Sequence, residues 1–97
     1  MLSQNEIKDA VHMIAPKYEI ESVYLFGSYA RGDASEDSDF DFRIVGGNFR
    51  SLYDLIAFRL DLEDTLGREV DVVQTKNIRD SFYRIIKDEE VLVYGRV

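Results

Sequence analysis

The sequence predicts an α/β (α+β) domain, with a small mixed β-sheet and helices mainly on one face of that sheet. One observation leads to this fold class, and a second leads to the number of domains. Helical spacing of apolar residues alternates with short runs of β-branched and aromatic residues, in the order α-β-α-β-α-β-α-β. The chain has 97 residues, 45% of them hydrophobic, with one proline and no repeat or linker. A single domain over residues 1–97 is therefore expected.

The amino-terminal part of the chain is expected to begin with a helix. Ser3 and Glu6 have the spacing of a capping box, in which each side chain bonds the backbone amide of the other residue. Apolar residues then recur at helical spacing until Pro16 stops the run. The elements that follow are a strand over residues 20–26, a helical turn over residues 29–31 and a polar loop over residues 32–38.

A strictly alternating strand over residues 39–45 comes next. Alternate residues of a strand lie on one face, so Asp39, Asp41 and Arg43 share a face opposite the apolar residues between them. The remaining elements are a helix over residues 51–66 with Gly67 at its C-cap, a strand over residues 70–74, a helix over residues 78–86 and a strand over residues 91–94. The acidic run from Asp88 to Glu90 is interpreted as an ordinary helix end.

Composition excludes several classes of function. The net charge is −7, from 19 acidic and 12 basic residues, which argues against binding to long nucleic acid. The absence of cysteine rules out disulfides and thiolate metal sites. No basic segment followed by an apolar run begins the chain, and no apolar run is long enough to span a membrane. A cytoplasmic protein without membrane association is expected.

Two short patterns carry possible chemistry. Asp39 and Asp41 lie on one strand face, so their carboxylates can converge on a pair of divalent cations, and oxygen ligands of this kind suit Mg²⁺. The alternative is an edge strand with a solvated polar face. Gly27-Ser28 follows a strand and opens a helical turn, where backbone amides and the serine hydroxyl can hold a phosphate. Together, the patterns describe a triphosphate held at both ends.

The residues that carry these patterns resemble a known family. Gly27-Ser28-Tyr29-Ala30-Arg31-Gly32 is followed, after five residues, by Ser38-Asp39-Phe40-Asp41. This matches the signature G-S-x-A-R-G-x5-S-D-x-D of the minimal nucleotidyltransferases, a branch of the DNA polymerase beta-like superfamily. The resemblance implies the polymerase-beta-like nucleotidyltransferase core. It also implies a third carboxylate on a later strand, for which Asp71 stands at the expected place.

The resemblance further implies roles for the three aspartates. Asp39 and Asp41 would hold the metal ions that bind the triphosphate of ATP. Asp71 would hold the ion nearest the acceptor, and would lower the pKa of the acceptor hydroxyl or take its proton. Two Mg²⁺ ions are expected as cofactors, with Mn²⁺ as a substitute and ATP as the substrate.

Nucleotide-binding roles are implied for four further residues. Gly27 and Ser28 would bind the terminal phosphates. Arg31 would pair with phosphate oxygens or cap the short helix, and Ser38 would orient Asp39 through a hydrogen bond. Arg43 departs from the usual pattern, since it shares the face of the aspartates. It would either contact phosphate or neutralise the acidic cluster.

The acceptor is not fixed by the sequence. Minimal nucleotidyltransferases of this kind resemble the antitoxins of HEPN toxin–antitoxin pairs, which implies transfer of AMP to a tyrosine of a HEPN ribonuclease. A non-catalytic antitoxin that occludes its partner, or transfer to a small molecule such as an aminoglycoside, stays open. The helix over residues 51–66 has two apolar stripes; either the sheet and a neighbouring helix cover both, or one serves a partner or self-association. The two stripes are Leu52, Tyr53, Ile56 and Leu60, and Leu55, Phe58, Leu62 and Leu66.

Overall fold

The computed structural model describes residues 2–95 of the chain. Four helices and four strands alternate along these residues, and two short 3₁₀ turns are added between them. The elements are α1 (Gln4–Ile14), η1 (Ala15–Tyr18), β1 (Ile20–Phe26), α2 (Ser28–Arg31), β2 (Phe40–Gly46), α3 (Leu52–Leu66), β3 (Val70–Gln74), η2 (Thr75–Asn77), α4 (Asp80–Ile86) and β4 (Val91–Gly95). This order confirms the predicted alternation.

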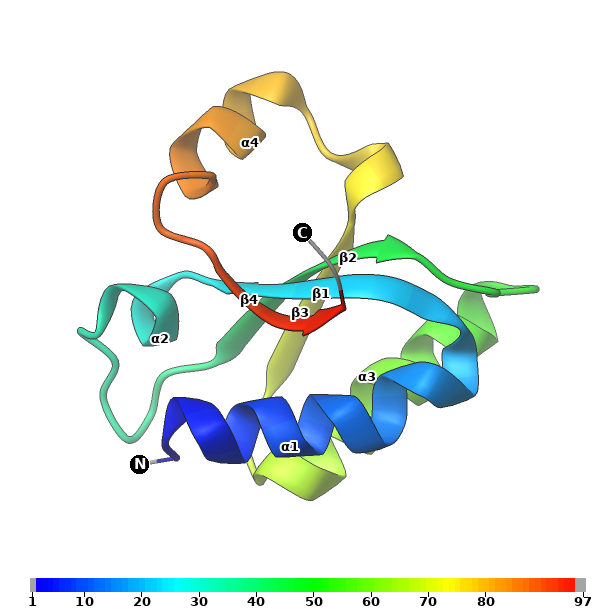
Figure 1. The fold of residues 1–97 in the computed structure, drawn as a ribbon, viewed down its shortest axis with the longest axis horizontal. Helices are drawn as coiled ribbons and strands as arrows, with labels where there is room; N and C mark the ends of the chain where they lie inside the picture. Colours follow the sequence, from blue (N-terminus) through cyan, green and yellow to red (C-terminus); the bar gives the residue numbers. More distant parts are fainter. Residues whose placement is uncertain (1, 96–97) are drawn as a thin grey trace.

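The four strands form one mixed sheet in the order β3-β2-β1-β4. Strand β1 pairs antiparallel with both β2 and β4, whereas β2 and β3 run parallel. Figure 1 shows α1 and α3 side by side beneath the sheet and α4 on its opposite side. The predicted fold class is therefore confirmed. Among residues 2–95, no helix combines the length and apolarity that a bilayer crossing requires.

The core lies between the sheet and the helix pair α1 and α3. On β2, Phe40, Phe42 and Ile44 are all buried, as the alternating pattern predicts. They pack in one cluster with residues of α1 and with Phe58 and Leu62 of α3. Burying side chains of this size stabilises a domain by roughly 1.5–3 kcal/mol each. The packing fixes the face of β2 that is left for the aspartates.

The capping signals at the helix ends lie where the sequence predicts them. Ser3 and Glu6 form the complete capping box of α1. Gly67 ends α3 in the left-handed conformation. Pro16 does end the α-helix, although the chain continues as the 3₁₀ turn η1, because proline is tolerated in the first turn of a helix.

Helix α3 uses only one of its two apolar stripes for the core. Phe58, Leu62 and Leu66 are buried, so these three residues of the second stripe are ordinary core and not a partner surface. The first stripe faces outward instead, with Tyr53 83% exposed and Leu52 70% exposed. The sequence could not distinguish the two stripes, since both are apolar at helical spacing.

Candidate active site

The turn between β1 and α2 approaches β2 closely. Gly27 lies at the N-cap of α2 with a φ of 77°, a backbone conformation that L side chains rarely adopt. A Cβ at this position would collide with the carboxylate of Asp41. Only glycine therefore allows the end of β1, the start of α2 and the Asp41 side chain to meet.

The three predicted aspartates lie around the start of the two parallel strands. Asp41 and Asp71 are register partners on β2 and β3, which are neighbours in the sheet. Asp39 precedes the first residue of β2 and is exposed, so it lies just outside the strand that the sequence predicted to include it. Asp41 is partly buried and Asp71 is exposed. The fold thus brings together carboxylates that are 30 or more positions apart.

The pKa of Asp41 is raised by burial and by this arrangement of carboxylates. Its pKa rises from 3.8 to about 6 because of burial, with further contributions from the negative charges of Asp71 and Asp39. Arg31 acts in the opposite direction, and Glu89 adds a smaller upward contribution. The carboxylates therefore repel one another in the metal-free protein, and a divalent cation would relieve that repulsion.

We expect this repulsion to appear in the pH dependence of stability. A carboxyl group whose pKa is higher in the folded than in the unfolded chain binds more protons when folded, between about pH 4 and pH 6. Its contribution to the free energy of unfolding therefore falls as pH rises through that window. Asp41→Asn removes the contribution. In metal-free buffer, the Tm of the variant minus that of the wild type should grow from pH 4 to pH 7. A difference that does not change with pH would contradict the assignment.

The donor set fits a hard divalent cation, but the side chains do not form a finished site. All three groups are carboxylates, and oxygen ligands are those that Mg²⁺ prefers. Among residues 2–95, no group of three or more Asp, Glu or His side chains is arranged so that it could already hold one ion. Catalytic groups are often loosely placed before substrate binds, so the aspartates would have to converge when nucleotide and metal arrive.

Arg31 and Ser38 have protein partners. The Arg31 guanidinium donates from Nε to Asp33 at 3.1 Å and from Nη1 to Glu89 at 3.1 Å. The Ser38 hydroxyl accepts a hydrogen bond from the Ser35 amide at 2.9 Å and so closes the loop before β2. Within residues 2–95, the predicted hydrogen bond between Ser38 and Asp39 is not formed.

Arg43 does not pair with the aspartates, which is one of the two roles that the sequence suggested for it. Its side chain is buried beneath α4, where it donates to Glu90 at 2.9 and 2.7 Å and to Thr75 at 2.8 Å. The guanidinium also lies over the ring of Tyr24, 4.2 Å from its centroid. The basic residue that faces the aspartates is Arg31, whose positive charge lowers the pKa of Asp41.

Two acidic residues near this site were missed by the sequence interpretation. Glu90 is the buried partner of Arg43, and Glu89 accepts hydrogen bonds from the Gly27 amide and from Arg31. Neither contact has a local signal, because the partners lie 47 to 62 positions away in the chain. An acidic run after a helix is otherwise a common surface feature.

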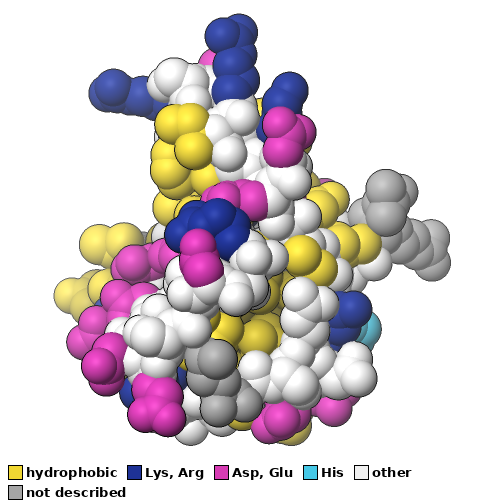
Figure 2. All heavy atoms as spheres, turned by 90° about the vertical axis from the view of Figure 1, so that its left-hand side faces the viewer, with side chains coloured by type: hydrophobic (Ala, Val, Ile, Leu, Met, Phe, Trp, Pro, Cys, Tyr) yellow, Lys and Arg dark blue, Asp and Glu magenta, His cyan; other side chains and the backbone are white. Residues whose placement is uncertain are grey.

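The end of the molecule that carries α2 is strongly acidic at its surface. Figure 2 looks onto this end and shows Asp and Glu side chains gathered over much of it, with basic side chains between acidic ones near the centre. These side chains would repel a triphosphate, and cations between them would reduce that repulsion.

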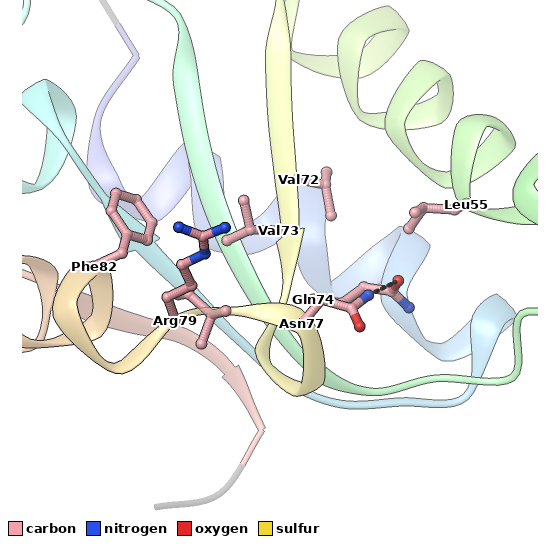
Figure 3. A pocket seen from close by; sticks show the side chains of 8 residues that line it. Leu55, Val72, Val73, Gln74, Asn77, Arg79 and Phe82 are labelled. Carbon is pink, nitrogen blue, oxygen red and sulfur yellow. Dashed lines mark hydrogen bonds between the residues drawn. The ribbon is translucent and has the colours of Figure 1, made fainter.

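A separate apolar pocket of about 440 Å³ lies along β3. Figure 3 shows Val73, Arg79 and Phe82 on one side of this strand, with Val72 and Leu55 on the other. None of the predicted site residues lines the pocket. Val73 follows Asp71 by two positions on the same strand, so the pocket and the carboxylates are neighbours and not one cavity.

Comparisons with known proteins identify a family. A family model described as polymerase beta, nucleotidyltransferase matches residues 8–96. A Methanocaldococcus jannaschii protein that bears the name putative protein adenylyltransferase is 38% identical, over 90% of this chain and 94% of that protein. The protein adenylyltransferase MntA of Thermococcus cleftensis is 32% identical, over 79% of this chain and 78% of that protein.

Solved structures show the same fold. A structure described as a putative minimal nucleotidyltransferase has a TM-score of 0.72 and 29% identity, over 91% of this chain and 89% of that chain. A toxin–antitoxin structure with AMP-PNP has a TM-score of 0.76 and 22% identity, over 98% of this chain and 75% of that chain. A tri-AMPylated Shewanella oneidensis HEPN toxin in complex with its MNT antitoxin has a TM-score of 0.74 and 16% identity, over 97% and 74% of the two chains.

Proposed function

The chain belongs to the polymerase beta nucleotidyltransferase family, and from this premise we propose that it transfers AMP from Mg-ATP to a hydroxyl group of another protein. The observation that carries the proposal is the register of Asp41 with Asp71, beside a turn at Gly27 that lies close against the Asp41 carboxylate. The relatives named protein adenylyltransferase support a protein as the acceptor.

The three aspartates would hold the metal ions. Asp39 and Asp41 would bind the ions on the triphosphate, and Asp71 the ion nearest the acceptor. Mg²⁺ supplies positive charge that neutralises the triphosphate and the charge that develops in the transition state. The raised pKa of Asp41 supports this assignment, since crowded carboxylates are the groups that a cation stabilises.

The remaining residues would orient the substrate. Ser28, at the start of α2, would donate to the terminal phosphates, and Arg31 would add positive charge at the same end. In the reaction, the acceptor oxygen bonds to the α-phosphorus, the bond to the β-phosphate breaks and pyrophosphate leaves. The acceptor proton would pass to Asp71 or to solvent.

A HEPN-type protein is the acceptor that we propose. Among the similar structures, one is of a tri-AMPylated HEPN toxin bound to an MNT antitoxin, and another is of a toxin–antitoxin with AMP-PNP. In this proposal the chain is the antitoxin, and AMP on a tyrosine of the ribonuclease silences it. Occlusion without catalysis is the second candidate, which the exposed apolar stripe of α3 favours.

Labelled nucleotide tests the transfer directly. The chain is incubated with ATP labelled at the α-phosphate, Mg²⁺ and a HEPN-domain protein, and intact masses are measured. One or more added AMP groups on the HEPN protein would support the proposal. A HEPN protein neutralised without any gain in mass would favour occlusion.

We expect the exposed stripe of α3 to bind the partner. Tyr53→Glu and Leu60→Glu place charge on side chains that are 83% and 46% exposed, so folding and ATP affinity should hardly change. Binding of the HEPN protein should weaken by about tenfold or more, because an unpaired charge is costly to bury in an interface. Titration calorimetry with each protein measures both affinities.

The control lies in the same helix. Phe58→Glu places the same charge on a fully buried side chain and should unfold the domain. Unchanged binding of the partner by the two surface variants would mean that the stripe is not the interface.

A further inference from the structure

The side chain of Glu89 connects the turn before β4 to both ends of α2. One carboxylate oxygen accepts a hydrogen bond from the Gly27 amide at 3.1 Å, and the other accepts one from Nη1 of Arg31 at 3.1 Å. Only 18% of the Glu89 side chain is exposed. Gly27 is the N-cap of α2 and Arg31 its last residue, so a single carboxylate fixes the whole turn.

The turn is thereby held between two carboxylates. Asp41 lies against the Cα of Gly27, in the space that a Cβ would need. Glu89 holds the amide of the same residue. Because this amide donates to Glu89, it is not free for a phosphate, and Ser28 is the next donor along the turn.

Glu89 is itself anchored to the strand that carries Asp41. The neighbouring residue Glu90 forms a buried, two-bond ion pair with Arg43 of β2, at 2.9 and 2.7 Å. Arg43 follows Asp41 by two positions. The backbone amides of Glu89 and Glu90 both donate to the carbonyl of Ile86 at the end of α4. The position of the Gly27 turn relative to Asp41 is therefore set through a continuous series of contacts.

We propose that Glu89 is a positioning residue for the phosphate end of the nucleotide, which holds Gly27 and Arg31 so that Ser28 meets the terminal phosphates. The inference rests on the proposed function and adds a residue outside the sequence motif. The Gly27 contact is a charge-assisted hydrogen bond to an amide, and the Arg31 contact keeps the guanidinium at the edge of the site. Loss of Glu89 frees the Gly27 amide and leaves Asp33 as the partner of Arg31.

Nucleotides that differ only in their phosphates provide the test. Calorimetry with Mg²⁺ gives the Kd of ATP and of AMP for the wild type, Glu89→Ala and Glu89→Gln. Glu89→Ala should raise the Kd of ATP by about tenfold and leave that of AMP within about twofold. Glu89→Gln keeps an oxygen for the Gly27 amide and should recover part of the loss. Asp88→Asn removes a charge from the neighbouring residue and should match the wild type.

Other results of this calorimetry would contradict either the role of Glu89 or the proposed function. An equal loss of ATP and AMP affinity in Glu89→Ala would mean a merely structural role and would overturn the inference. ATP affinity that stays unchanged, or that increases because a competing carboxylate is gone, would also overturn it. A wild-type chain that binds neither nucleotide would overturn the proposed function itself. Wild-type binding with unaffected Glu89 variants would leave the function standing and contradict only the role of Glu89.

Discussion

Asp39→Asn and Asp41→Asn each lower the rate of AMP transfer by roughly three orders of magnitude or more, if these carboxylates hold the metal ions. An amide is a neutral and weaker ligand than a carboxylate, so charge on the triphosphate is no longer compensated. The substitutions keep the size of each side chain, and Asp41→Asn removes a charge that is repelled in the folded state. The rate is measured with α-labelled ATP and the HEPN partner.

Stability provides the control for these two variants. Asp41→Asn should be as stable as the wild type or more stable at neutral pH without metal, so a lost activity cannot be ascribed to unfolding. Glu36→Gln, an exposed change in the loop before β2, should leave the rate unaltered. Transfer at the wild-type rate by either aspartate variant would show that the metal ligands lie elsewhere.

Asp71→Asn should separate binding from chemistry. If Asp71 serves the acceptor side, the triphosphate is still held by Ser28 and the other two aspartates, and the ATP affinity is largely kept. The transfer rate should nevertheless fall by about two orders of magnitude or more, because activation of the acceptor is lost. ATP affinity and rate falling in the same proportion would place Asp71 on the nucleotide side.

The fold could be predicted because its signals are local. The capping box of α1 lies within four residues, and Gly67 ends α3 one position after its last apolar residue. The alternation on β2 placed Phe40 and Phe42 in the core correctly. Such signals depend on backbone geometry and on the period of a helix or strand, both of which a single segment determines.

The contacts around Arg43 could not be predicted in the same way. Alternation placed Arg43 on the aspartate face correctly, but that face is divided. Arg43 is buried against Tyr83 of α4, whereas Asp41 is only partly buried. Which acidic residue meets Arg43 depends on the course of the chain after α4, more than 40 positions later. Helix α3 has the same ambiguity, since packing alone selects one apolar stripe.

Breaking the buried ion pair should strongly destabilise the domain. Arg43→Met leaves the charged carboxylate of Glu90 without its ion-pair partner. Only 9% of the Glu90 side chain is exposed, so the charge stays buried. Removing one member of a buried pair costs about 3–5 kcal/mol. The substitution also removes the contacts of the guanidinium with Tyr24, Tyr83 and Thr75. For a domain of this size, the loss lowers Tm by about 15 °C or more, measured by thermal unfolding.

A double variant distinguishes the charge from the packing. In Arg43→Met, Glu90→Leu no buried charge is left, and apolar replacement of a buried ion pair is often neutral or stabilising. The double variant should therefore be more stable than Arg43→Met alone, by about 2 kcal/mol or more.

Arg59→Met is the matched control, because the Arg59–Glu63 pair is partly exposed and worth about 0.5 kcal/mol. If the double variant were as unstable as Arg43→Met, the stacking on the two tyrosines and the bond to Thr75 would outweigh the ion pair. If Arg43→Met lowered the free energy of unfolding by less than Arg59→Met does, the buried ion pair would not stabilise the domain. The ion pair could then not be the contact that anchors Glu89.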